Sequence, residues 1–188
     1  MRCIVTPRAE RLRFRHCFSI PGLIMYRDSS ATFDFLTLRC LNFSNPWKDA
    51  ASKKRLLGKL KATKMRLGLS VEAEVVLDDH AHVLLHTQAG QANSTLLEDL
   101  RSGLCDVNEM ANASRETWVA DIEHRTLVGI SQARAHLDFI HYQPVLCGLV
   151  ERAIEYDWSS LPARVEQGHY PENWAELAPP ASIAQVPV

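Results

Sequence analysis

Two strand-like runs separated by two acidic residues most constrain how this chain can fold. Residues 71–77 (VEAEVVL) and 80–87 (HAHVLLHT) are rich in β-branched and aliphatic side chains, and can form one long strand bent locally at Asp78-Asp79. Side chains alternate between the faces of a strand, so His80 and His82 point the same way, with Cα atoms roughly 6–7 Å apart. Both imidazoles can then reach one metal ion if a third ligand is found; otherwise one histidine belongs to the core and the other to an edge.

Helical and strand patterns alternate irregularly along the rest of the chain. Residues 32–41 and 118–127 read as strands. Three helices are expected. The first covers residues 49–67, with Asp49 as N-cap and Gly68 as stop, and the second covers residues 95–112. The third begins at its N-cap Ser131 and runs to about Gln143, where Pro144 ends it. Without a βαβ rhythm or an internal repeat, this order predicts an α+β fold with a mainly antiparallel sheet.

The length and composition predict a single domain. The chain has 188 residues, 46% of them hydrophobic, which is enough for one compact core. We place this domain at residues 31–176. An irregular basic segment, residues 1–30, precedes it, and a small, Pro-rich tail, residues 177–188, follows and is expected to be mobile.

The formal net charge of -1 conceals an uneven distribution along the chain. Residues 1–68 contain 15 Lys and Arg against four Asp and Glu, whereas residues 69–188 contain six against 18. Either the first part forms a basic surface that meets phosphates, or the two parts neutralise each other across a shared surface. The candidate DNA contacts are Arg11, Arg13 and Arg15 before the first strand, and Lys53, Lys54, Lys61 and Lys64 on the solvent-facing side of the first helix.

Cysteine usage and hydropathy indicate the compartment. The five cysteines are scattered, without a Cys-x-x-Cys pair, which is typical of reduced thiols. The apolar run near the start, residues 20–26, is broken by Pro21-Gly22, and no run reaches the ~20 apolar residues of a membrane span. We therefore expect a soluble, cytoplasmic protein that does not interact with a membrane.

The helix expected after residue 130 carries an unusual face. Gln132, His136, Phe139 and Gln143 recur at helical spacing and so share one side. Two amides, a histidine and a phenylalanine are an odd set for a face that packs against a core. The amide oxygen of Gln143 could complete the site begun by His80 and His82, and leave positions open for water or a phosphate oxygen.

Three segments together resemble a known family. The stretch VVLDDHAHVLL is similar to the His-hydrophobic-His strand of the HUH single-strand DNA transposases. HLDFIHYQPVLCGLVERAIEYDWSS resembles the helix and turn of one branch, the REP-associated tyrosine transposases, and EQGHYPENW looks like the C-terminal signature of that branch. Weaker similarity covers RHCFSIPG and TFDFLTL, so the resemblance spans residues 15–176 in the same order as in the family.

The resemblance implies a ferredoxin-like antiparallel sheet flanked by helices, and a specific chemistry. In the family, two strand histidines and a helix amide hold Mg²⁺ or Mn²⁺, and a tyrosine one turn before the amide attacks a phosphate of single-stranded DNA. The attack gives a 5′-phosphotyrosyl intermediate and a free 3′-hydroxyl. Here the implied ligands are His80, His82 and Gln143, with Gln in place of the usual Asn. The nucleophile position is Phe139, and His136, one turn earlier, is a candidate proton acceptor.

Phenylalanine has the ring of tyrosine without its oxygen, so we expect a cleavage-defective protein that binds single-stranded or hairpin DNA, as a monomer or homodimer. Three alternatives stay open: a substitute nucleophile, a domesticated protein that marks or represses palindromic repeats, and a metal-dependent nuclease that uses water. A fourth is a domain with a vestigial site. The candidate substitutes are Tyr26, Tyr142, Tyr156 and Tyr170.

Overall fold

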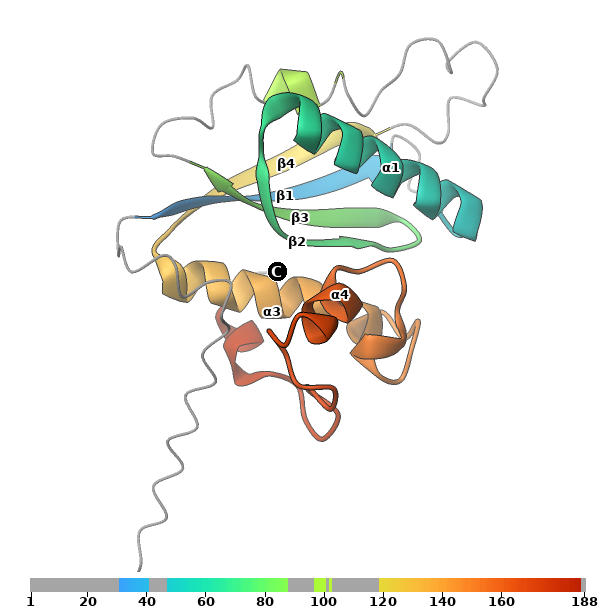
Figure 1. Cartoon of the computed structure of the whole chain (residues 1–188), viewed down its shortest axis with the longest axis vertical. Coiled ribbons are helices and arrows are strands. Elements are labelled where there is room, and N and C mark those ends of the chain that lie inside the picture. Colours follow the sequence, from blue (N-terminus) through green and yellow to red (C-terminus); the bar gives the residue numbers. More distant parts are fainter. Residues whose placement is uncertain (1–30, 41–46, 88–96, 101, 103–118, 187–188) are drawn as a thin grey trace, which may run out of the picture.

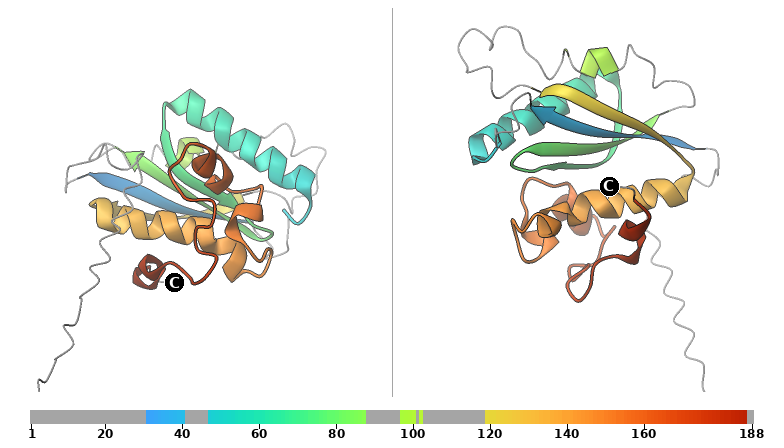
Figure 2. Two further views of the ribbon diagram at one scale, coloured as in Figure 1. Left: turned by 60° about the horizontal axis from the view of Figure 1, so that its bottom comes forward. Right: turned by 180° about the vertical axis from the view of Figure 1, so that it is seen from behind.

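The computed structural model describes residues 31–40, 47–87, 97–100, 102 and 119–186. The elements, in chain order, are β1 (Thr32–Cys40), α1 (Ala50–Leu67), β2 (Ser70–Val76), β3 (His80–Thr87), β4 (Val119–Val128), α3 (Ile130–Leu146), the 3₁₀ turn η4 (Ala153–Glu155), α4 (Leu161–Glu166) and the 3₁₀ turn η5 (Ala181–Gln185). Residues 97–100 and 102 are also helical. Figures 1 and 2 show how these elements surround one sheet.

The four strands form one antiparallel sheet in the order β2-β3-β1-β4. This is the strand order of a ferredoxin-like core, so the predicted α+β class is confirmed. The prediction of one long bent strand through Asp78-Asp79 is wrong. The Leu77 N–H donates to the His80 carbonyl over 2.9 Å and closes a tight hairpin, in which β2 and β3 run side by side.

Helices cover both faces of the sheet, and the alternation of β1 side chains explains why. Phe33 and Phe35 point to the face covered by α3, where they join a core with residues of that helix. Leu36 and Leu38 point to the opposite face, where they pack against Leu56 and other apolar residues of α1. Figure 1 shows the sheet between the two helices.

The predicted limits of α1 are confirmed because both of its caps are present. The Asp49 carboxylate accepts a hydrogen bond from the Ser52 N–H over 2.9 Å, and Gly68 takes the left-handed conformation at φ 64°. One detail of the prediction is wrong. Lys53 does not lie on the solvent-facing side of the helix. Its side chain is buried, and its amino group contacts the Asp78 carboxylate at 2.6 Å.

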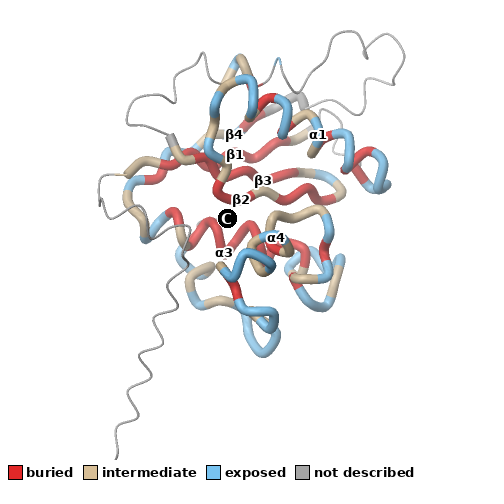
Figure 3. Tube along the Cα trace, viewed as in Figure 1, coloured by how far each residue is buried: buried red, intermediate tan, exposed pale blue. Residues whose placement is uncertain are grey.

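The α3 helix is longer at both ends than the sequence predicts. Its N-cap is Gly129, not Ser131, and Pro144 lies inside its last turn. Proline removes one backbone donor, yet the Cys147 N–H still donates to the Gln143 carbonyl over 2.9 Å, so the helix continues past Pro144. Figure 3 shows α3 as largely buried, because the sheet covers one side and the C-terminal segment covers the other.

Part of the C-terminal tail, expected from its composition to be mobile, packs against the domain. The η5 turn packs against α3, where the Ser182 hydroxyl donates to the Asp138 carboxylate over 2.6 Å and Val186 is buried. Composition alone does not reveal such a contact, because it depends on the outer face of α3. The segment 1–30 and most of the helix expected at residues 95–112 lie outside the described residues.

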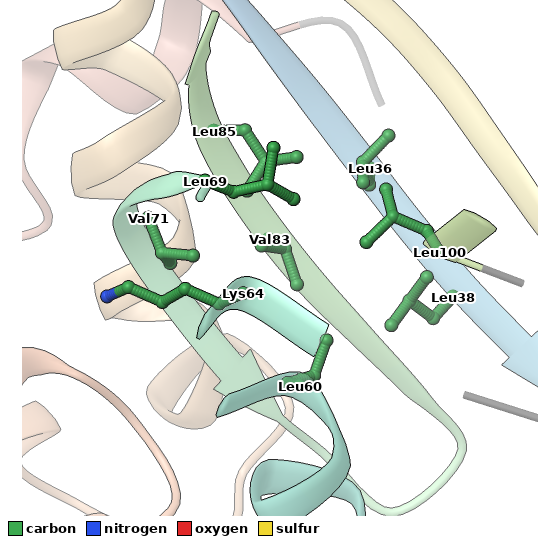
Figure 4. Close-up of a pocket in the computed structure, with 9 residues that line it drawn as sticks. All are labelled: Leu36, Leu38, Leu60, Lys64, Leu69, Val71, Val83, Leu85 and Leu100. Atoms are coloured by element: carbon green, nitrogen blue, oxygen red, sulfur yellow. The ribbon is translucent and has the colours of Figure 1, made fainter. Parts of the chain in front are cut away.

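An apolar cavity lies between α1 and the sheet (Figure 4). Its walls come from α1, the three strands β1 to β3, the link between α1 and β2, and the short helical segment at residues 97–100. The lining residues are Leu36, Leu38, Leu60, Lys64, Leu69, Val71, Val83, Leu85 and Leu100. The cavity lies on the sheet face opposite His80 and His82.

Within the described part of the chain, no helix is both long and apolar enough to span a membrane.

Candidate functional site

Strand β3 places His80 and His82 together on the α3 face of the sheet. Their ring centroids lie 4.7 Å apart and their planes meet at 74°. His82 is buried at 6% exposure, whereas His80 is partly exposed. The prediction that the two imidazoles share one face is confirmed, and their spacing is short enough for both to approach a single ion.

Each imidazole has a neighbour that fixes one ring nitrogen. The Asp79 carboxylate accepts a hydrogen bond from His80 Nδ1 over 2.7 Å. Thr37, which stands opposite His82 in the β1–β3 register, places its hydroxyl 3.1 Å from His82 Nδ1. Both contacts use Nδ1, so Nε2 is the atom that each ring can offer to a cation. A second hydrogen bond of this kind commonly orients a metal-binding histidine.

His82 is held in its neutral form. Burial lowers its pKa to about 3, and the nearby charges of His80 and Arg39 act in the same direction. A neutral imidazole is the form that binds a metal, because the protonated ring has no free lone pair. The buried position of His82 therefore keeps its ring neutral, the form that can bind a metal, at neutral pH.

An aromatic cluster joins the histidine pair to α3. Phe35 of β1 stacks on His82 with centroids 5.0 Å apart and an interplanar angle of 25°. Phe139 of α3 contacts both rings, at 5.6 Å from His82 and 6.3 Å from Phe35. Packing of Phe35 between strand and helix thus brings residue 139 beside His82.

Gln143 lies one helical turn after Phe139, and so projects from the same side of α3. Its side chain is buried, and its amide oxygen accepts a weak hydrogen bond from the Cys147 thiol over 3.5 Å. Burial raises the pKa of this thiol, and the nearby Asp79 and Asp78 charges raise it further. The C-terminal end of α3 therefore lies close to the turn that precedes His80.

The metal ligands that the sequence predicts are of two kinds, imidazole nitrogens and an amide oxygen. Within the described ranges, no group of three or more His, Cys, Asp or Glu side chains is arranged to hold a metal ion. The third ligand that the sequence predicts is an amide oxygen, which lies outside that class of donors. Whether Gln143 binds together with His80 and His82 stays a prediction.

His136 lies on α3 one turn before Phe139, and its ring contacts Phe35 edge-on at 4.9 Å. Its Nδ1–H donates to the Gln132 carbonyl over 2.9 Å. In the neutral ring, Nε2 then carries no proton and has a lone pair that can accept one. This Nε2 is buried and has no hydrogen-bond partner. Burial lowers the pKa of His136 more than the hydrogen bond to Gln132 raises it, and Arg125 adds a smaller lowering effect, so the ring is neutral at neutral pH. Its role as a proton acceptor stays a prediction.

The tyrosines in the described part of the chain have other contacts. The Tyr156 hydroxyl donates to the Val76 carbonyl over 2.7 Å, and the Tyr170 hydroxyl donates to Asp138 over 2.9 Å. Burial raises the pKa of both hydroxyls. Tyr142 packs edge-on against Trp174 of the C-terminal segment, with centroids 6.3 Å apart. These contacts disfavour all three as substitutes for a nucleophile at residue 139; Tyr26 lies outside the described residues.

The structure does not bring the lysines of α1 to the histidine pair. Lys54 and Lys61 are exposed on α1, across the sheet from His80. Lys64 is half-buried, and in Figure 4 its stem lines the apolar cavity. Lys53 is buried against Asp78, and the predicted contacts Arg11, Arg13 and Arg15 lie outside the described residues.

Sequence reasoning missed four neighbours of the histidines: Phe35, Thr37, Arg39 and Asp79. The alternation along TFDFLTLR places the first three on one strand face, and Asp79 is adjacent to His80. That face was recognisable from the sequence. Its pairing with β3 was not, because strands 45 residues apart can pair in several registers.

A solved structure described as a REP-associated tyrosine transposase bound to a REP hairpin has a similar fold. The two chains superpose with a TM-score of 0.63 and 22% sequence identity, over 78% of this chain and 86% of the other. No protein-family model and no curated protein matches the sequence. At this identity, the likeness establishes a shared fold, namely a four-stranded antiparallel sheet flanked by helices.

Proposed function

We propose that this chain is a DNA-binding member of the REP-associated tyrosine transposases that keeps a divalent-cation site and lacks the nucleophile. One observation carries the proposal: the Phe139 ring lies 5.6 Å from the His82 ring, in the helix position that the family gives to its tyrosine. This contact supports the proposal that the aromatic ring of the family's nucleophile is retained beside His82 and that its hydroxyl is lost.

Two independent likenesses support the ancestry. The sequence carries the His-x-His strand, the helix motif and the C-terminal signature in the family's order. The fold matches that of a transposase whose structure contains a REP hairpin. Phe35 contacts both His82 of the strand motif and Phe139 of the helix motif. The two motifs that resemble the family are therefore neighbours in the folded chain, as a shared site requires. Hairpin DNA with a single-stranded flank is therefore the ligand that we expect.

The residues present fit a divalent cation. His80 and His82 would offer Nε2, since their Nδ1 atoms are taken by Asp79 and Thr37, and Gln143 would add an amide oxygen. When bound, such a cation withdraws charge from a phosphate oxygen. Two imidazoles favour Mn²⁺ over Mg²⁺ among the cations that the family uses. We expect weak Mn²⁺ binding that tightens with DNA.

Cleavage requires an oxygen nucleophile, and residue 139 has none. In the family's reaction, the tyrosine oxygen forms a bond to phosphorus while the bond to the 3′ oxygen breaks. Phe139 cannot take part in that exchange, and Tyr156 and Tyr170 are engaged elsewhere. The protein would hold the DNA strand at the cation site without cutting it.

The proposal is tested with a labelled DNA hairpin that has a single-stranded flank, in buffer with Mn²⁺. We expect the unmodified protein to bind the hairpin more tightly than a duplex of the same length, and to leave every strand intact on a denaturing gel. Cleavage without a covalent adduct would favour a nuclease that uses water. Failure to bind the hairpin at low salt would remove the DNA-binding function altogether.

A further inference from the structure

An arginine borders the histidine pair. Arg39 of β1 stands directly opposite His80 in the β1–β3 register, two residues after Thr37. It therefore projects from the same sheet face as both histidines. In the same register, Thr37 stands opposite His82, so Arg39 and the two histidines lie on adjacent positions of the paired strands. The sequence pattern alone assigns no role to this residue.

The guanidinium of Arg39 is only partly engaged. Its Nε lies 3.4 Å from the Glu123 carboxylate of β4, too far for a good hydrogen bond, and this buried nitrogen has no hydrogen-bond partner. The side chain of Arg39 is 39% exposed and that of Glu123 is 59% exposed. An ion pair this open to water contributes little to folding.

We propose that Arg39 is a phosphate-binding residue for the DNA strand beside the His80–His82 site, and that Glu123 occupies it until DNA binds. This inference rests on the proposed function and adds a named contact to it. A guanidinium presents a planar fork of donors that matches two phosphate oxygens. A phosphate near Nε2 of the histidines would lie beside Arg39, which can exchange its loose contact with Glu123 for the phosphate.

The arrangement predicts opposite effects for the two partners. Removing the charge of Arg39 loses a phosphate contact, whereas removing the charge of Glu123 frees the guanidinium and removes a carboxylate that repels DNA. A phosphate contact also releases counterions, so its loss reduces the dependence of affinity on salt. A purely structural ion pair would give the same sign for both variants, because either change would break it.

The experiment measures binding of a fluorescent DNA hairpin with a single-stranded flank, by anisotropy over a series of salt concentrations. Arg39→Gln should lower the affinity about tenfold at low salt and reduce the log–log salt slope by about one. Glu123→Gln should raise the affinity, and Arg39→Lys should keep the salt slope with a smaller loss. Arg152→Gln is the matched control, because Arg152 is a half-exposed arginine that also pairs with glutamates, Glu155 and Glu176.

The outcomes separate this inference from the proposed function. If the unmodified protein binds the hairpin and Arg39→Gln matches the Arg152→Gln control, Arg39 is no phosphate contact and the DNA-binding function stands. If Glu123→Gln and Arg39→Gln weaken binding alike, the pair is structural and the inference is wrong. If the unmodified protein fails to bind at low salt, both proposals are overturned. Thermal unfolding of each variant identifies any loss of affinity that comes from loss of fold.

Discussion

The two imidazoles of His80 and His82 show how much a single atom decides at this site. Each ring has two nitrogens, and Nδ1 is the one in contact with the protein, through the Asp79 carboxylate for His80 and the Thr37 hydroxyl for His82. Without these bonds, each ring could turn or change tautomer and lose the position of Nε2. The cation affinity should therefore depend on residues that would never touch the cation.

This dependence can be measured with two variants. Asp79→Asn and Thr37→Val should each lower Mn²⁺ affinity about 10- to 100-fold, as observed for the supporting partners of metal ligands. Titration calorimetry with Mn²⁺ checks the change, with circular dichroism to confirm the fold. Glu151→Gln, a change at an exposed acid on the segment after α3, is the control. Equal Mn²⁺ affinity in both variants and the control would show that the ring orientation is fixed by packing alone.

Lys53 and Asp78 support the turn before the histidines. The Lys53 amino group lies 2.6 Å from the Asp78 carboxylate and 5.5 Å from the centre of the Tyr156 ring. Because the Lys53 side chain is 7% exposed and that of Asp78 is 23% exposed, Lys53→Met leaves a partly buried carboxylate without its partner. The free energy of unfolding should fall by ~2–4 kcal/mol in urea titrations. Adding Asp78→Asn should restore part of this loss; no recovery would mean that the methylene packing of Lys53 matters more than its charge.

At the scale of elements, the joint between α3 and the C-terminal segment depends on a buried carboxyl group. Asp138 accepts hydrogen bonds from Tyr170 and Ser182, yet burial raises its pKa more than these bonds lower it. A raised pKa means that the folded state holds the proton more firmly than the unfolded chain. The stability from Asp138 is then complete below its ordinary pKa of 3.8 and is lost as the pH rises through the folded value.

Asp138→Asn tests this sign. The variant keeps a hydrogen-bonding side chain and cannot ionise, so its free energy of unfolding relative to the unmodified protein should increase from pH 4 to pH 7. Urea unfolding at both pH values measures the difference. A difference that stays constant with pH, or that changes in the other direction, would show that the carboxylate is stabilised by its two hydroxyl partners.

The sequence predicted those elements whose signals are local. The caps of α1 lie within four residues of its ends, so Asp49 and Gly68 were sufficient to place it. The β2–β3 hairpin was missed, because Asp78-Asp79 carries no glycine or asparagine to mark a tight turn. Pro144 was read as a stop by a local rule that tertiary packing overrides at the end of α3.

The candidate site divides in the same way. His80 and His82 share a face because a strand alternates, and this was evident from two residues. Their approach to Phe139 also follows from the sequence, through a resemblance whose two motifs are about 60 residues apart. Thr37 and Arg39 were out of reach, because a strand's partner and register depend on contacts distant in sequence.

At the scale of the whole molecule, the uneven charge distribution raises the question of which face of the sheet binds DNA. The exposed Lys54 and Lys61 of α1 lie on the sheet face opposite His80. If DNA also contacts α1, reversing both charges with Lys54→Glu and Lys61→Glu should weaken binding to all sequences about equally and reduce its salt dependence. The effect of Mn²⁺ on binding should stay the same, because the histidines are on the other face.

Hairpin-binding titrations with and without Mn²⁺ measure both quantities. A loss of the Mn²⁺ effect in the charge-reversed protein would mean that the two faces act as one DNA path. Unchanged affinity would assign the α1 lysines to neutralising the acidic part of the chain, the second interpretation of the charge distribution.

The central claim is that this site lacks only the oxygen at residue 139. It is tested most directly by incubating Phe139→Tyr with a 3′-labelled hairpin and Mn²⁺, and looking for label that stays with the protein on a denaturing gel. Tyrosine has an ordinary pKa of ~10 and needs help to ionise, for which the cation and the free Nε2 of His136 are the available groups. We predict at least trace covalent adduct with Phe139→Tyr, none with the unmodified protein, and none when His82→Ala is added. Tight hairpin and Mn²⁺ binding by Phe139→Tyr without any adduct would contradict the account.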